Sequence, residues 1–289
     1  MKNKTKIKEF NKRLEKLLNN YKDHDPECKN YLSNKKFFNN FFLDHKNNKN
    51  PKIYLGKMGK IKLPFYRMGE ITSYELLGID EIIIFCFYLK MSNFFSKASD
   101  LGANIGLHSI ILDKMKYKIK SFEPDKDHLI QFQKNLLINK SANIKIFNKA
   151  VDINVGKVEF TKIINNTTSS FIKNSKKKYY GPTKKYLVKT YPFNKILKWS
   201  NILKIDVEGM EGELIQSTQN NDWLNKIAIL EIGNKKNAES IFRHSKKIKL
   251  NIFCQKNGWS KANKIKDMPS SYKHGSAILT TYDKNPWLY

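Results

Sequence analysis

The stretch Asp100-Leu-Gly-Ala-Asn-Ile-Gly106 decides the fold, because it joins an expected strand to an expected helix through two glycines. Gly102 lacks a Cβ atom, so the backbone can turn sharply there and approach a ligand closely. Gly106 lets the start of the helix pack tightly against the strand. The free N–H groups at that helix N-terminus suit an anionic group such as a carboxylate. Two glycines alone would also fit an ordinary strand–helix joint.

A second expected strand ends in Phe122-Glu-Pro124. An acidic residue at the tip of the second strand, roughly 20 residues beyond the glycines, is where a ribose is held through its hydroxyls. A dinucleotide site has a further glycine in the middle of the loop to make room for the pyrophosphate, and Asn104 occupies that position. The sequence therefore predicts a nucleoside ligand without a pyrophosphate, such as S-adenosylmethionine (SAM), and disfavours a dehydrogenase.

The segment Ile202-Leu-Lys-Ile-Asp-Val-Glu-Gly209 predicts an apolar strand that ends in two carboxylates. Such carboxylates lie in the crevice where α/β proteins bind ligands. Asp206 and Glu208 are two residues apart and would point the same way along an extended strand. The candidate roles are a general base for a substrate hydroxyl, a partner of the SAM amino group, or a helix cap. Asp206 is the first candidate for the base; His108 is a second, although packing or capping explains it equally simply.

Between and beyond these blocks, short apolar segments alternate with helical patterns. This alternation predicts an α/β fold with a mostly parallel sheet covered on both faces. The region 155–190 breaks the alternation and is expected to be an insertion with antiparallel pairing. The expected strands are 97–101, 119–122, 144–148, 202–207, 228–232 and 277–282, and the expected helices between them are 106–115, 126–138 and 212–218.

The chain is expected to consist of two parts. Residues 1–50 are polar with apolar positions at helical spacing, which predicts a helical N-terminal extension outside the main core. Residues 45–52 resemble an exposed linker. Residues 51–289 form the main domain, which would open with a hairpin at 53–65 and a helical segment at 73–95.

Four ordered blocks resemble the FkbM family of SAM-dependent methyltransferases. These blocks are Asp100-Leu-Gly-Ala-Asn-Ile-Gly106, Phe122-Glu-Pro124, Asn148-Lys-Ala-Val-Asp152 and Lys204-Ile-Asp-Val-Glu-Gly-Met-Glu211. The loop Thr168-Ser-Ser170 also resembles the middle section of the family. The resemblance covers residues 75–235 and departs at Lys97 and Ser99, where apolar residues are expected.

This resemblance implies a class I methyltransferase fold, which is a doubly wound, Rossmann-like sheet of seven strands, and SAM as the cofactor. It implies methyl transfer to a hydroxyl oxygen of a sugar, a glycan or a related metabolite. The cofactor-binding residues it implies are Asp100, Gly102, Asn104 and Gly106 for the methionine part, Glu123 for the ribose, and Ala150 and Val151 for the adenine. Asp206 and Glu208 would be the catalytic residues, nearest the methyl group.

The formal net charge of +28 leaves the partner open. Such an excess attracts phosphate-rich partners. However, it consists mostly of Lys spread along the chain beside abundant Asn, as an AT-rich coding sequence would give, and Arg occurs only at positions 13, 67 and 243. The basic run 173–185 is either a solvated loop or a surface for an anionic acceptor. Alternatives to a small-molecule or glycan methyltransferase are therefore an RNA methyltransferase and a non-catalytic nucleic-acid-binding protein on a degenerate SAM fold.

The remaining composition favours a cytoplasmic protein. Three cysteines without a close pair predict neither a disulfide framework nor a metal site. The N-terminus lacks the apolar segment of a signal peptide, and the longest apolar run, 82–89, is too short to span a bilayer.

Overall fold

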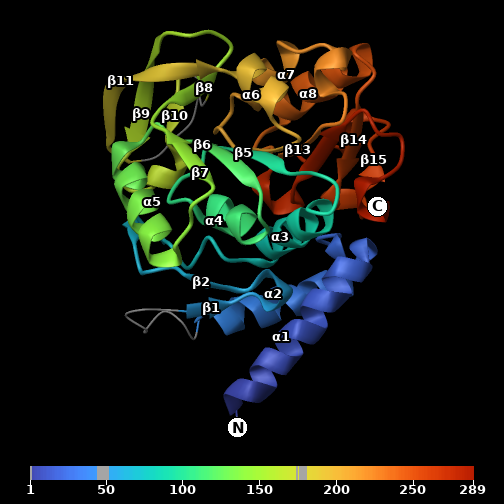
Figure 1. The fold of residues 1–289 in the computed structure, drawn as a ribbon. Coiled ribbons are helices and arrows are strands. Elements are labelled where there is room, and N and C mark those ends of the chain that lie inside the picture. Colours follow the sequence, from blue (N-terminus) through green and yellow to red (C-terminus); the bar gives the residue numbers. More distant parts are fainter. Residues whose placement is uncertain (1, 44–51, 174, 176–180) are drawn as a thin grey trace.

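The computed structural model of the protein describes residues 2–43, 52–173, 175 and 181–289. Its centre is an eight-stranded sheet with the order β15-β14-β16-β13-β12-β5-β6-β7 (Figure 1). The four pairs from β13 to β7 are parallel, and β14, β15 and β16 add antiparallel pairs. The strands are β5 (Lys97–Leu101), β6 (Lys118–Phe122), β7 (Ile144–Phe147), β12 (Ile202–Ile205), β13 (Ile227–Leu230), β14 (Asn251–Cys254), β15 (Ser260–Lys261) and β16 (Ala277–Thr280).

Seven of these strands form the predicted class I methyltransferase sheet, and the two-residue strand β15 extends one edge. Helices cover both faces: α3, α4 and α5 lie on one side and α6, α7 and α8 on the other (Figure 1). The doubly wound α/β fold is confirmed. These helices are α3 (Ile79–Met91), α4 (Leu107–Lys114), α5 (Lys126–Asn139), α6 (Phe193–Trp199), α7 (Glu211–Gln216) and α8 (Lys235–Lys247).

The strand before the glycine loop alternates between the two faces of the sheet. On β5, Ser99 turns its hydroxyl to that of Ser200 at 2.7 Å, and Lys97 is exposed. The polar residues that depart from the family pattern are thus either hydrogen-bonded or in solvent, so they do not disrupt the strand.

The N-terminal helices are α1 (Lys2–Asn19) and α2 (Lys29–Leu43), as predicted, but they are not separate from the main core. Phe10, Leu14 and Phe38 are fully or almost fully buried, and they belong to one hydrophobic cluster with residues of α3, α4 and β5. The expectation of an extension outside the main core is wrong in this respect. The reason is that α3 is apolar on nearly all sides, so it needs a cover on the side away from the sheet as well.

The insertion between β7 and α6 forms a second, four-stranded sheet with the order β10-β9-β11-β8. Its β9–β10 and β9–β11 pairs are antiparallel, as predicted. The strands are β8 (Ala150–Asp152), β9 (Lys157–Ile163), β10 (Phe171–Ile172) and β11 (Thr183–Pro192); two short hairpins, β1 (Lys52–Tyr54) with β2 (Lys60–Lys62) and β3 (Arg67–Met68) with β4 (Ile71–Thr72), precede α3. The expected linker at 45–52 lies almost entirely outside the described residues, as does much of the basic run 173–185.

Candidate functional site

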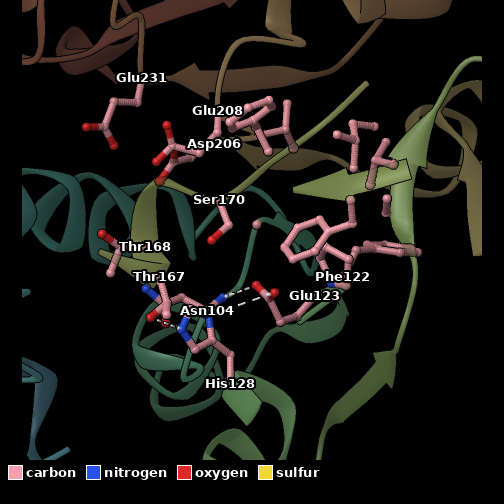
Figure 2. Close-up of a pocket in the computed structure, with 18 of the residues that line it drawn as sticks. Asn104, Phe122, Glu123, His128, Thr167, Thr168, Ser170, Asp206, Glu208 and Glu231 are labelled. Carbon is pink, nitrogen blue, oxygen red and sulfur yellow. Dashed lines mark hydrogen bonds and ion pairs between the residues drawn. The ribbon is translucent and has the colours of Figure 1, made fainter. Parts of the chain in front are cut away.

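A cleft that is open to solvent lies at the carboxyl ends of the parallel strands. This is the position where doubly wound sheets bind their ligands. Figure 2 shows its side chains converging from the main sheet, the glycine loop and the insertion. Of the predicted site residues, Gly102, Asn104, Glu123, Ala150, Val151, Asp206 and Glu208 line it, and Asp100 and Gly106 do not.

The glycines of the loop are required by contacts within the protein. At Gly102, φ is +78°, and an added Cβ would lie 1.8 Å from the carbonyl oxygen of Asp206. At Gly106, an added Cβ would lie 2.0 Å from the ring of Phe132 in α5. Gly102 therefore lets the loop after β5 pack directly against the backbone that follows β12, and it also lines the cleft.

Asn104 and Glu123 connect the glycine loop to the tip of β6. The backbone N–H of Asn104 donates to Glu123 Oε2 at 2.7 Å (Figure 2). The backbone N–H of Asp125 donates to Glu123 Oε1 at 2.8 Å. Burial, followed by the nearby charges of Asp125 and Asp100, outweighs these bonds and raises the pKa of Glu123 to about 8. The Oδ1 atom of Asn104 is buried and has no hydrogen-bond partner among the described residues. A buried acceptor of this kind indicates a ligand donor.

The insertion supplies the opposite wall with hydroxyl groups. Thr167, Thr168 and Ser170 line the cleft, and Thr167 Oγ1 is 2.8 Å from Nε2 of His128 (Figure 2). His128 is buried, and this burial lowers its pKa to about 4, so the ring is neutral at physiological pH. Lys162 anchors the same insertion to the start of α5 by ion pairs to two aspartates at 2.8 and 2.5 Å.

The end of the cleft beyond Glu123 is apolar. Phe122, Ala150, Val151 and Phe160 form it, and the ring of Phe122 stacks on that of Phe147 at 4.8 Å. A planar, weakly polar base would bury its faces against these side chains.

The opposite end of the cleft is acidic. Asp206 follows β12 and accepts a hydrogen bond from Lys204 Nζ at 2.9 Å, and Glu231 follows the adjacent strand β13. Burial would raise the pKa of Asp206, but the charge and hydrogen bond of Lys204 hold it below its ordinary value. Burial and the neighbouring charges of Asp206 and Glu81 raise the pKa of Glu231 well above its ordinary value. The two shifts run in opposite directions, so of these adjacent carboxyls Glu231 holds a proton more readily than Asp206.

Glu208 reaches the cleft by a different route from the one predicted. Strand β12 ends at Ile205, and Glu208 lies in a turn with φ of +55°, so the argument from an extended strand is wrong there. The buried Glu211 holds this turn by accepting hydrogen bonds from the N–H groups of Val207 and Gly209 at 2.9 and 3.1 Å. Glu208 itself accepts a hydrogen bond from the Tyr272 hydroxyl at 3.0 Å. Strained backbone of this kind is concentrated at functional sites.

Behind the cleft wall, two predicted residues are held by partners within the protein. Asp100 is fully buried and accepts a hydrogen bond from Ser109 Oγ at 2.6 Å, which ties β5 to α4. His108 is buried between Glu81, at 2.7 Å, and the hydroxyl of Tyr88, at 3.1 Å. Glu81 lines the cleft and His108 does not.

Comparison with known proteins identifies the family. The model of the methyltransferase FkbM domain matches residues 100–253, which is more than half of the chain. The chain belongs to the FkbM methyltransferase family. This FkbM protein is thus a methyltransferase, and its cofactor is SAM. No curated protein matches it.

Two solved structures are similar to this FkbM protein at low sequence identity. One is a precorrin-6y C5,15-methyltransferase from Geobacter metallireducens, at 11% identity, which covers 68% of this chain and 84% of its own, with a TM-score of 0.38. The other is an rRNA methylase from Streptococcus thermophilus, at 7% identity, which covers 70% and 95%, with a TM-score of 0.37. The description of the fold therefore rests on the strand order itself.

The residues of the cleft fit SAM. The buried Oδ1 of Asn104 needs a donor, the Glu123 carboxyl can accept from hydroxyls, the apolar end suits an adenine, and the acidic end suits a sulfonium and an ammonium group. Sequence reasoning missed Lys204, Glu231, Glu81, His128 and Thr167. Of these, only Lys204 lies inside a recognised motif; the others are brought in by elements far apart in the sequence.

Proposed function

We propose that this FkbM protein transfers the methyl group of SAM to a hydroxyl oxygen of a neutral acceptor, such as a sugar, a glycan or a related metabolite. The observation that carries this proposal is the composition of the cleft. One wall presents the hydroxyls of Thr167, Thr168 and Ser170, and the other presents Asp206, Glu208 and Glu231. Hydroxyl and carboxyl groups pair well with a polyhydroxylated acceptor, whereas an anionic group at the acidic end would be repelled.

The sulfonium of SAM is an activated methyl donor, so the protein has to position the acceptor and remove its proton. Asp206 and Glu208 are the proposed catalytic residues. Lys204 keeps Asp206 ionised, so this carboxylate can accept a hydrogen bond from the acceptor hydroxyl and orient its lone pair. Glu208 is held by the strained turn and by Tyr272, and would bind a second hydroxyl.

Incubation with SAM carrying a labelled methyl group tests this proposal. Neutral oligosaccharides should receive label in a product that survives mild alkali, because methyl ethers are stable there and methyl esters are not. Matched phosphorylated or carboxylated oligosaccharides should receive less. Label in an alkali-labile product, or a preference for the anionic series, would contradict the proposed acceptor.

An RNA acceptor is a second candidate, favoured by one surface. Strands β5, β6 and β7 carry four lysines on the same face of the sheet as α6, and we call Lys97, Lys118, Lys120 and Lys145 the lysine row. The ammonium of Lys120 lies 4.2 Å above the ring of Trp199. Aligned cations beside an aromatic ring suit a single-stranded phosphate backbone. RNA binding that weakens steeply with salt and disappears when the row is neutralised would favour this candidate.

A further inference from the structure

We propose that Glu231 recognises the sulfonium charge of SAM, carrying its own negative charge only while that sulfonium is bound, and later accepts the proton of the acceptor hydroxyl. This inference rests on the proposed function. It assigns Glu231 a role that no sequence motif indicates, and it assigns different roles to the two adjacent carboxyls.

Glu231 is surrounded by ionisable side chains. Its side chain lies at the cleft wall at the carboxyl end of β13, and its backbone N–H donates to the carbonyl of Ile205 at 3.1 Å. The ionisable groups that face it are Lys204 on β12, Asp206 directly after β12, Glu81 on α3 and Glu208 in the turn. The Glu208 carboxyl also accepts a hydrogen bond from the Tyr272 hydroxyl.

Negative charge exceeds positive charge in this group. Lys204 is the cation nearest to Asp206, and Glu81 is already paired with His108 at 2.7 Å. Burial and the charges of Asp206 and Glu81 raise the pKa of Glu231 well above its ordinary value, so this carboxyl holds a proton at neutral pH when the cleft contains no cation. Asp206 stays ionised because it has the hydrogen bond from Lys204.

A cation bound at the acidic end changes the balance between the protonated and the ionised form of Glu231. A sulfonium at the acidic end adds one positive charge near Glu231 and favours its ionised form, so binding expels the proton to solvent. S-adenosylhomocysteine (SAH), the product, has a neutral sulfur and lacks this charge. The two ligands are otherwise the same, so their difference isolates the group that responds to the sulfonium.

The proton of the acceptor hydroxyl moves to Glu231 during methyl transfer. Glu231 takes the proton of the acceptor hydroxyl while the new O–C bond forms and the C–S bond breaks, with the C–S electron pair left on sulfur. The sulfonium charge disappears as Glu231 becomes neutral, so the net charge of the cleft is the same before and after the step. Glu231 regains its high proton affinity in the same event, which favours this carboxyl over Asp206 as the proton acceptor.

Calorimetric titration in buffers of different ionisation enthalpy measures the protons released on binding. At pH 7, we expect SAM to release about one proton more than SAH. Glu123 faces the ribose, which both ligands share, so its contribution cancels in the difference. In Glu231→Gln, the difference should vanish and SAM should bind about tenfold more weakly, with the affinity for SAH unchanged. Glu239→Gln, a surface carboxyl on α8, is the matched control and should behave as the unmodified protein.

Each other outcome overturns a defined part of the account. Equal proton release with SAM and SAH in the unmodified protein would refute the proposal, and a difference that persists in Glu231→Gln would assign the proton to another carboxyl. If Glu231→Gln fails to bind SAH, Glu231→Asp provides the second test. This variant keeps a carboxyl group, so it should keep the difference in proton release between SAM and SAH. Failure of the unmodified protein to bind either ligand would instead refute SAM as the cofactor on which the proposed function rests.

Discussion

Two buried or half-buried lysines on strands of the same sheet lie in opposite electrostatic surroundings. Lys204 on β12 is 8% exposed and lies among carboxyls; burial opposes its charge, but Asp206, Asp100 and Glu81 outweigh burial and raise its pKa. Lys120 on β6 belongs to the lysine row; burial and then the charges of Lys145 and Lys97 lower its pKa. The comparison teaches that a net charge of +28 describes the surface, and that the cleft has the opposite sign.

Substituting each of these two lysines should give the largest of the expected effects, a difference in the free energy of unfolding between the two variants. Lys204→Met leaves buried carboxyls without their cation, so the free energy of unfolding should fall by about 3–5 kcal/mol. Lys120→Met removes a charge from a repulsive row and should change it by less than about 0.5 kcal/mol. Urea denaturation of both variants measures this, and equal losses would show that the two surroundings do not differ as described.

Within the cleft, substitutions at the acidic end should lower kcat, whereas substitutions at the ribose end should weaken SAM binding. Asp206→Asn should lower kcat by about 100-fold with little change in SAM affinity, because the carboxylate acts on the acceptor. Glu123→Ala should weaken SAM binding, because the ribose loses its acceptor and the glycine loop loses its bond to β6. Steady-state kinetics with calorimetry measures both effects. An equal loss of SAM affinity in the two variants would refute this division of roles.

The pKa of Glu123 predicts a pH dependence of cofactor binding. Its value of about 8 means that the carboxyl is mostly protonated at pH 7 in the free protein, whereas ribose hydroxyls bind best to the ionised form. The affinity for SAH should therefore rise as the pH increases from 6.5 to about 8 and then level off, by up to about tenfold per pH unit. Dissociation constants across this range provide the measurement. In Glu123→Gln the curve should be flat; an unaltered curve would assign the dependence to another group.

The lysine row should matter least for the cofactor. Neutralising three of its four lysines, Lys97, Lys120 and Lys145, to Gln should leave the SAM dissociation constant within about twofold, because none of the three lines the cleft. A matched triple variant on α8, at Lys235, Lys246 and Lys247, controls for the change in net charge. A loss of SAM binding confined to the row variant would mean that the two regions are coupled.

The sequence was informative wherever the signal was local. The strand–glycine–helix joint at 100–106, the acid at 123 and the carboxylates at 206 and 208 follow one another in short motifs, and the structure brings most of them to one cleft. Each of these signals depends on neighbours within a few residues, and they were enough to predict the sheet.

What the sequence could not predict depends on contacts between distant segments. Glu81 precedes the glycine loop and Glu231 follows a later strand, and neither lies in a recognised motif. Only the folded structure brings both carboxyls close to Lys204. The left-handed turn at Glu208 depends on Glu211, a residue that lies in the last motif block and to which we assigned no role from the sequence. We predicted that the N-terminal helices lie outside the core, because the sequence of their partner α3 does not indicate which of its sides they cover.

The most direct test of the account is calorimetric titration of the protein with SAM at physiological cofactor concentrations. The account predicts saturable binding at one site per chain, strongly weakened in Glu123→Ala and retained in the variant with the lysine row neutralised. Absence of binding, or binding that Glu123→Ala leaves intact, would contradict the assignment of this cleft as the SAM site.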